Sequence, residues 1–586
     1  MAFNIGLNVI ETDGTAAPAI AGAATSVAAF NIVTERGVPN RPMRVTSFAD
    51  FSARFGGFIA ETPGAYMVKG FFDNGGGVAY VNRVAATGDG APEPASLVLR
   101  TGSGAAARDV LRLTAGYRGQ EDPGEWADDL AIEITPTFSS ALRGPTPEVN
   151  QTGANLDSLA GFSRGDSVFV VDADTTRRVT VTDLRVDDGR MTWSTLDGVG
   201  EYDAATTTVQ SSDFDVVVRA SRADDAPVLE TWTRLTMRRL APNYVVTRLN
   251  DPASGSKFLF ASDERSAQFG AADQPGTAPL MALGDGDAGD EIQAADYAGT
   301  DGATKTGLHA FDPFAVQLVA VDTADAAVIN ASLAYCEGRG DCMFVGHVPQ
   351  GSVPGGSAID FGADLQGSKY GALYGPWVSV LDQRPGAVTP TRLVPPTGHV
   401  LGVYARTDRT RGIHKAPAGD GARLLGALDV EHRLSDADHD ALVRLGSVNG
   451  IRVVPGAGIV VDASRTLSTD TRWMFVNVRL LFNYVKSSLR QGLRWVRQEP
   501  NRDQLWDSVK YSTVKPFLIG LYRQGAFGTG TPDEVFTIIC DATNNPPDEV
   551  DKGNFKVEVY FYPSKPAETI VIVVGQQQSG SSASEG

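Results

Sequence analysis

Cysteine is scarce in this sequence. Its 586 residues include three cysteines, Cys336, Cys342 and Cys540. An odd, low number argues against a disulfide framework and is typical of a reducing compartment. No histidines with metal-binding spacing surround Cys336 and Cys342, so we expect these two to be small buried hydrophobic side chains. We expect no cofactor.

Long apolar runs and an excess of positive charge are also missing. No run of 18 apolar residues exists, so the sequence predicts no membrane span. No basic stretch precedes the first apolar residues, which argues against a secretory signal. The net charge of −19 makes a nucleic-acid-binding surface over the whole chain a poor hypothesis. We therefore expect assembly in the cytoplasm, with neither nucleic acid binding nor direct membrane insertion.

Enzyme signatures are absent as well. The sequence has no Gly-x-Ser-x-Gly elbow, no strand–turn–helix setting for a nucleophile and no His-Glu-x-x-His pair among its six histidines. The glycines at 75–77 end a helical pattern and lack a following Lys-Ser/Thr, so they are not a phosphate loop. We predict no catalytic residue.

One acidic loop invites a calcium interpretation. It spans Leu283–Glu291 and holds Asp285, Asp287, Asp290 and Glu291. Its glycine and its final glutamate do not fall where the twelve-residue calcium loop needs them. The loop is therefore read as solvated, and we predict no metal site.

The sequence is long enough for several domains. Over 25–134 and 241–467, strand-like runs alternate with helical patterns, which predicts a mixed α/β fold. Predicted elements include a helix over Phe48–Phe55 capped by Thr46 or Ser47, a strand over Asn243–Asn250 and a helix over Asp325–Arg339. Between the two regions, 135–240 has short β runs separated by Gly/Asp turns and is interpreted as an inserted β domain.

Both ends of the chain are interpreted as arms. Residues 1–24 alternate and then become small, which is typical of a strand and hinge, although a frayed terminus is the alternative. Residues 468–566 combine helical patterns with a hairpin signal, and 567–586 hold an apolar run and a polar tail. A bare terminal strand recruits other chains. The run either closes its own sheet or is lent to a neighbouring copy.

The second interpretation predicts a donor strand and an acceptor hairpin. A two-stranded hairpin alone is marginally stable and needs partners at its edges. The predicted strand-exchange arm consists of Thr569, Ile570, Val571, Ile572, Val573 and Val574. The predicted acceptor hairpin includes Val535, Phe536, Ile538, Phe555, Val557 and Val559.

Positive charge gathers in one stretch of this acidic chain. Between Thr471 and Phe527 there are ten Lys or Arg and three acidic residues, a local charge of +7. At about 100° per residue, four of the basic residues share one face of a predicted helix, with Trp473 and several apolar residues on the other side. This basic face is a binding surface or a solvated face. Its residues are Arg479, Lys486, Arg490 and Arg494.

The order of motifs in this stretch resembles the C-terminal domain of contractile tail sheath proteins, found in contractile bacteriophages and related injection systems. Each motif is weak alone, but the order is specific. The motifs are the Arg-rich run Trp473–Arg497, Glu499-Pro500-Asn501, Leu505-Trp506, Gly525-Ala526 with Gly528, the hairpin, and Pro566-Ala567-Glu568.

Upstream segments resemble the same family. Ser368–Trp377 is similar to its signature region, and Val461–Leu467 to its Gly-Ala-Arg-Thr-Leu strand with two substitutions. The chain departs from the pattern at Thr397, where the family usually has serine, and at Ala127, where it often has glycine. The resemblance covers most of the chain outside 135–240.

The resemblance implies a subtilisin-like α/β core with an inserted β domain, an α+β C-terminal domain and extended strand-exchange arms at both ends. It implies a structural subunit whose copies form six-membered rings around an inner tube and contract from a metastable extended state. The implied partners are other copies, the inner tube at the basic face, the baseplate and the terminal cap proteins. A static strand-exchanging shell or surface array, and a hydrolase on a subtilisin-like scaffold, are the alternatives.

Overall fold

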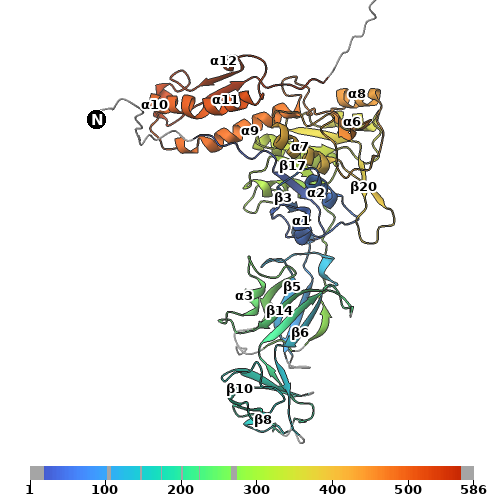
Figure 1. The fold of residues 1–586 in the computed structure, drawn as a ribbon, viewed down its shortest axis with the longest axis vertical. Helices are drawn as coiled ribbons and strands as arrows, with labels where there is room; N and C mark the ends of the chain where they lie inside the picture. Colours follow the sequence, from blue (N-terminus) through green and yellow to red (C-terminus); the bar gives the residue numbers. More distant parts are fainter. Residues whose placement is uncertain are drawn as a thin grey trace, which may run out of the picture.

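The computed structural model describes residues 19–101, 107–144, 148–172, 175–199, 202–223, 225–265, 274–276 and 278–568. Three tiers follow one another along the long axis of the molecule (Figure 1). A core and the C-terminal domain form the broad end, a β domain lies below them, and a second β domain forms the far end. This arrangement confirms the prediction of a mixed α/β multi-domain fold. No described helix is both long and apolar enough to cross a membrane.

Short apolar runs form the eight-stranded sheet of the core. Such runs suit strands that are covered on both faces, as parallel strands are. Every pairing is parallel except those of the two edge strands, β2 and β24. In sheet order the strands are β2 (Met43–Val45), β3 (Ala79–Arg83), β1 (Ala28–Ile32), β17 (Leu318–Val321), β18 (Met343–His347), β19 (Gly371–Gly375), β23 (Val448–Val454) and β24 (Gly458–Val461).

Helices cover both faces of this sheet. Neighbouring residues of β1 point to opposite sides, so Phe30 joins one apolar cluster and Ala29 the other. The first cluster includes α1 (Phe48–Phe55), α2 (Gly64–Asp73) and α7 (Thr397–Arg411), and the second includes α5 (Ala326–Arg339), α6 (Ser357–Asp364) and α8 (Asp436–Leu445).

Two helix predictions are confirmed by their caps. The Ser47 hydroxyl accepts from the backbone of Asp50 at the start of α1, and the Asp325 carboxylate accepts from the first turn of α5. The strand predicted over Asn243–Asn250 is wrong, because this segment forms α3 (Val245–Leu249). Its β-branched residues suggested a strand, but Val245 and Leu249, one helical turn apart, are both buried in the β domain.

The chain leaves the core sheet after β3 and returns to it at β17. Most of this excursion builds a middle domain whose two sheets enclose one apolar cluster. One sheet holds β14 (Val228–Leu235), β13 (Phe214–Arg219), β6 (Ala131–Pro136) and β16 (Ala278–Ala282), and the other holds β15 (Leu259–Asp263), β5 (Arg108–Ala115) and β4 (Ser96–Thr101).

A second excursion, between β6 and β13, forms the outer domain at the far end of the molecule (Figure 1). It has its own apolar cluster. Its sheet consists of β7 (Ser139–Ala141), β12 (Thr208–Ser211), β9 (Ser167–Val171), β10 (Thr176–Arg185), β11 (Arg190–Trp193) and β8 (Gly153–Asn155).

The inserted domain predicted for 135–240 therefore has different limits in the structure. Its first part is the outer domain, but β13 and β14 belong to the middle domain. There β14 pairs with β13, β13 pairs with β6, and β6 pairs with β16. The sequence prediction placed most of β6 and all of β16 in the core, at 25–134 and 241–467. The pattern of short β runs showed that strands exist, but it carried no information about their distant partners.

A buried ionic cluster joins the core to the middle domain. Arg36 Nε donates to the Asp122 carboxylate at 3.0 Å, and the Arg83 guanidinium lies 3.7 Å from the other oxygen. The backbone N–H of Gly37 also donates to Asp122, at 2.5 Å. The Arg36 guanidinium lies 3.8 Å above the Trp126 ring. Removing one partner of such a buried pair costs about 3–5 kcal/mol, so this cluster is a strong link between the domains.

Excision of the outer domain should leave the rest of the protein folded. Pro136 faces Phe214 across the β6–β13 pair, and the Thr137 N–H donates to the Asp213 carbonyl at 2.9 Å. We expect that replacing residues 138–212 with Asn-Gly, a two-residue hairpin turn, closes this pair directly. Calorimetry should show loss of only the outer-domain contribution, with the remaining unfolding unchanged.

A matched deletion tests the same boundary from the other side. Replacing 138–219 with Asn-Gly also removes β13, which lies between β6 and β14 in the middle sheet. We expect this second variant to lose the middle domain as well. Equal stability of the two variants would contradict the boundary.

Two buried histidines should make stability fall in acid. Burial lowers the pKa of His347 to about 3, and burial lowers the pKa of His399 to about 4. Unfolded histidine takes up its proton near pH 6.5, so the unfolded state binds more protons between that pH and the folded pKa values. The free energy of unfolding should therefore fall as pH drops from about 6.5 towards 4, by up to about 1.4 kcal/mol per pH unit for each histidine.

Chemical denaturation between pH 7 and pH 4 measures this slope. The variant His399→Gln should flatten it, because Gln does not titrate. Asp73 and Lys69 are the charged groups that act on His399, so both stay unchanged. His432→Gln, at a half-buried position, is the matched control. Identical slopes for the wild type and His399→Gln would contradict the prediction.

Candidate assembly surfaces of the C-terminal domain

One long helix, α9 (Val476–Gly492), organises the C-terminal domain. Its apolar residues Val476, Leu481 and Val485 are buried, and they join the cluster that also covers one face of the core sheet. The remaining elements are η6 (Arg494–Val496), α10 (Asp503–Asp507), the π-helical η7 (Ser508–Val514), α11 (Lys515–Arg523), α12 (Pro532–Val535), β25 (Phe536–Ile539), α13 (Pro547–Asp551) and β26 (Glu558–Phe561).

Arg479 does not lie on an exposed basic face, and this part of the prediction is wrong. The residue is 3% exposed. Its guanidinium carbon lies 4.5 Å from the ring centre of Tyr370 and 4.6 Å from that of Trp473. Burial lowers the pKa of Arg479. The helical projection placed Trp473 on the opposite side, but the helix begins only at Val476, so its angular rule does not apply to Trp473.

Lys486 and Arg490 are exposed but also contact the core. Lys486 Nζ donates to the Gly340 carbonyl at 2.6 Å, and a guanidinium nitrogen of Arg490 lies 3.7 Å from Asp341. Asn483, about one turn before Lys486 on the same helix, donates its amide N–H to the Cys342 carbonyl at 3.1 Å. This face of α9 therefore docks on the turn that follows α5. Burial and the neighbouring arginines lower the pKa of Lys486.

Arg494 is exposed and lies beyond α9, in η6. Gly492 is the last residue of the helix. The four predicted residues thus divide into one buried cation, two that bridge to the core and one on the surface past the helix end. Arg490, whose side chain is 68% exposed, and Arg494 are the two that a partner can reach most easily.

The predicted hairpin is present. Strands β25 and β26 pair antiparallel, with Phe536 opposite Phe561 and Ile538 opposite Val559. Phe536 and Ile538 are buried against the rest of the domain. Three residues of the predicted acceptor hairpin lie outside its two strands. Val535 ends α12, while Phe555 and Val557 precede β26.

This sheet has two strands within the described part of the chain, so no third strand pairs with either of its edges there. The predicted donor strand, Thr569 to Val574, lies outside the described residues, as do residues 1–18 of the N-terminal arm. The first described residues run along the end of α9. The Ala23 N–H donates to the Ser488 hydroxyl at 3.0 Å, and Ile20 packs against Gly492.

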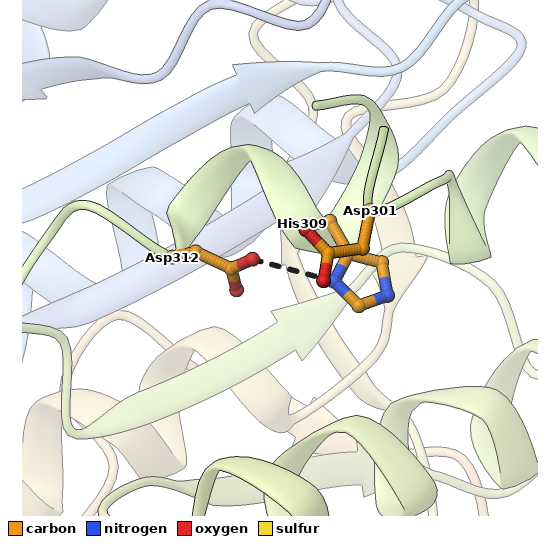
Figure 2. A group of neighbouring side chains, drawn as sticks. All are labelled: Asp301, His309 and Asp312. Carbon is orange, nitrogen blue, oxygen red and sulfur yellow. Dashed lines mark hydrogen bonds and ion pairs between the residues drawn. The ribbon is translucent and has the colours of Figure 1, made fainter. Parts of the chain in front are cut away.

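One group of potential metal ligands occurs among the described residues, formed by Asp301, His309 and Asp312 (Figure 2). The Asp312 carboxylate lies 3.4 Å from His309 Nδ1. Lys305 Nζ bridges the two aspartates, 2.8 Å from Asp312 and in contact with Asp301. The lysine ammonium therefore supplies the positive charge here, and the group forms a surface ion-pair network.

A buried hydroxyl and a histidine form a pair that the sequence did not reveal. Thr397 begins α7 directly after β21 (Thr391–Val394) and two prolines, and its hydroxyl lies 3.0 Å from His347 Nδ1. The chain thus has a strand–turn–helix setting here, and the prediction that it has none is wrong. Thr397 is fully buried and His347 is 1% exposed, which closes the pair to a substrate. We interpret it as packing of α7 on β18.

Comparison with known proteins supports the family resemblance that the motifs indicated. The family model of the phage tail sheath C-terminal domain matches residues 468–577. The tail sheath protein of Vibrio phage KVP40 is 29% identical over 176 residues, which cover 30% of this chain and 25% of the phage protein. The match therefore spans about a quarter of that relative's length.

Solved structures share the fold over most of the chain. The sheath tail protein from Listeria innocua has a TM-score of 0.53 at 10% identity, covering 93% of this chain and 96% of its own. The helical sheath of the anti-feeding prophage in its contracted state has a TM-score of 0.50 at 16% identity, covering 98% and 100%. Residues 468–577 thus match the phage tail sheath C-terminal domain family, and the chain as a whole is similar in fold to solved sheath proteins.

Proposed function

We propose that this protein is the structural subunit of a contractile sheath. Its copies polymerise as stacked six-membered rings around an inner tube and contract from a metastable extended state to drive that tube into a target. The observation that carries this proposal is the match of residues 468–577 to the phage tail sheath C-terminal domain. The likeness of nearly the whole chain to contractile sheath structures supports it at the level of fold.

The proposal includes a subtilisin-like core. An eight-stranded, mostly parallel sheet with helices on both faces supports that assignment. A subtilisin-like fold does not by itself imply catalytic activity, because function depends on the site and not on the fold. The sealed Thr397–His347 pair favours a structural role over the hydrolase alternative.

Strand exchange is the proposed link between copies. No third strand pairs with the two-stranded β25–β26 sheet in the described part of the chain, and two strands alone are marginally stable. The run from Thr569 to Val574 of one copy is proposed to pair with this hairpin in another, and the N-terminal arm to add a further strand. Linked arms keep copies connected while the rigid domains reorient.

The proposed partners beyond the sheath itself are the inner tube, the baseplate and the terminal cap proteins. Assembly is proposed to occur in the cytoplasm of a bacterial cell, before the subunit becomes part of a phage tail or phage tail-like particle. Stored conformational free energy drives a single stroke, so no cofactor is needed. About a few kcal/mol per subunit, summed over many copies, gives a large mechanical output.

Negative-stain electron microscopy of the purified protein tests the proposal. Long helical tubes with two different pitches, one extended and one contracted, are the expected result. Flat lattices would instead identify a static surface array. Particles that never polymerise, alone or with the inner tube protein, would overturn the proposal.

Removing the donor strand should prevent polymerisation. Its six residues can form about five ladder hydrogen bonds worth about 0.5–1.5 kcal/mol each. Burial of Ile570, Ile572 and Val574 adds roughly 1.5–3 kcal/mol per side chain. A chain ending at Glu568 keeps every described contact and should give folded, soluble monomers. A chain ending at Gly575 retains the strand without the polar tail and should still form tubes. Tubes of normal length from the shorter chain would contradict strand exchange.

Reversing the accessible basic residues should weaken binding to the inner tube. We expect Arg490→Glu with Arg494→Glu to reduce sheath–tube association at low salt, because exposed charge pairs are weak singly but repeat in every copy. The matched control, Arg177→Glu with Arg178→Glu, makes the same charge change on exposed residues of the outer domain. Co-sedimentation with tubes measures the difference. Equal binding by both double variants would contradict a tube-facing basic surface.

A further inference from the structure

Arg465 and Glu568 form an ion pair where the predicted C-terminal arm begins. Arg465 Nε donates to one carboxylate oxygen of Glu568 at 2.7 Å, and a terminal guanidinium nitrogen donates to the other at 2.5 Å. This two-pronged geometry fits the planar guanidinium to the planar carboxylate, and it restricts rotation as well as distance. Glu568 is the last residue before the strand proposed to leave the subunit.

Arg465 is itself held by the core sheet. Its backbone N–H donates to the Asn449 side-chain oxygen at 2.6 Å, and the Asn449 amide donates back to the Arg465 carbonyl at 2.8 Å. The same amide donates to the Leu373 carbonyl at 3.0 Å. Asn449 is fully buried on β23, opposite Tyr374 of β19. The backbone of Arg465 is therefore fastened to a mostly parallel sheet that is covered on both faces.

The chain between the hairpin and Glu568 is fastened at successive points. The Ser564 N–H donates to the Ala526 carbonyl at 3.1 Å, and its carbonyl accepts from the Asn477 amide at 3.2 Å. Lys565 Nζ donates to the Thr471 carbonyl at 3.2 Å. The segment thus crosses the start of α9 and reaches the core before the proposed arm begins.

We infer that the Arg465–Glu568 pair is the anchor that fastens the exchanged C-terminal arm to the core of its own subunit. The inference rests on the proposed function, because it assigns the arm a second copy of this chain as its partner. The inference adds the path by which a mechanical force on the arm is transmitted to the core. A pull on the arm reaches the core sheet through Glu568, Arg465 and Asn449, in parallel with the path through the hairpin.

The geometry separates this pair from an ordinary surface ion pair. The side chains are only 16% and 34% exposed, both carboxylate oxygens are used, and the partners are far apart in sequence. Arg472 and Asp470 provide the contrast. They lie two residues apart, and the Arg472 side chain is 81% exposed, so their contact links no distant segments.

Charge reversal with rescue tests the anchor in the full-length chain. We expect Arg465→Glu and Glu568→Arg each to reduce tube formation at least tenfold in electron micrographs, and the double variant, in which the charges are exchanged, to restore it. Glu568→Gln, which removes the charge without reversing it, should give an intermediate loss. Arg472→Glu is the matched control and should polymerise like the wild type.

Hydrogen exchange of the unassembled chain gives a readout that does not depend on tubes. The backbone amides of Ser564, Lys565, Ala567 and Glu568 should exchange at least tenfold faster in each single variant, and return to the wild-type rate in the exchanged pair. Exchange in β23 should stay unchanged, which shows that the core is intact.

The outcomes separate the anchor from the proposed function. Normal tubes from both reversal variants, no rescue by the exchanged pair, or unchanged hydrogen exchange would each overturn the anchor. A wild-type chain that forms no tubes would overturn the proposed function, and the arm's load path with it. The exchange measurement would then still decide whether Glu568 is held by Arg465.

Discussion

The buried carboxylate of Asp122 joins the core to the middle domain through its contacts with two arginines. The excursion from β3 to β17 carries the middle and outer domains, so its base determines how both are oriented on the core (Figure 1). Arg36 and Arg83 supply the opposite charges, and Trp126 covers the Arg36 guanidinium. Because the desolvation of these ions is offset only when all partners are present, the cluster favours one orientation over a flexible linkage.

Helix α9 has a comparable role at the other end of the molecule. Its start lies beside the segment that leads to the C-terminal arm, through the Asn477–Ser564 contact. Its end lies beside the first described residues of the chain, through the Ser488–Ala23 contact. Its basic face docks on the turn after α5 through Lys486. One rigid element therefore positions the bases of both proposed arms relative to the core.

Several motifs acquire a physical role in this arrangement. Trp126, next to the position at Ala127 where the chain departs from the family pattern, covers the Arg36 guanidinium at the domain junction. Arg465 of the strand motif and Glu568 of the final Pro-Ala-Glu motif pair with each other, although 103 residues separate them. Trp473, at the start of the Arg-rich motif, stacks on buried Arg479. In each case a side chain from one of these positions contacts a segment that is distant in sequence. This contact is a physical reason why few other residue types would fit at that position.

The sequence by itself determined the elements whose signals are local. Ser47 and Asp325 cap their helices, the apolar runs of the core form buried strands, Gly492 ends α9, and the β25–β26 hairpin forms around its turn-rich loop. Tertiary structure decided what depends on distant partners. It assigned β13 and β14 to the middle domain, folded the stretch around Val245 into a helix, and buried Arg479 between two rings. Caps and turns are satisfied by neighbours within a few residues, whereas strand partners, burial of a cation and the Arg465–Glu568 pair depend on which remote segments the whole fold brings into contact.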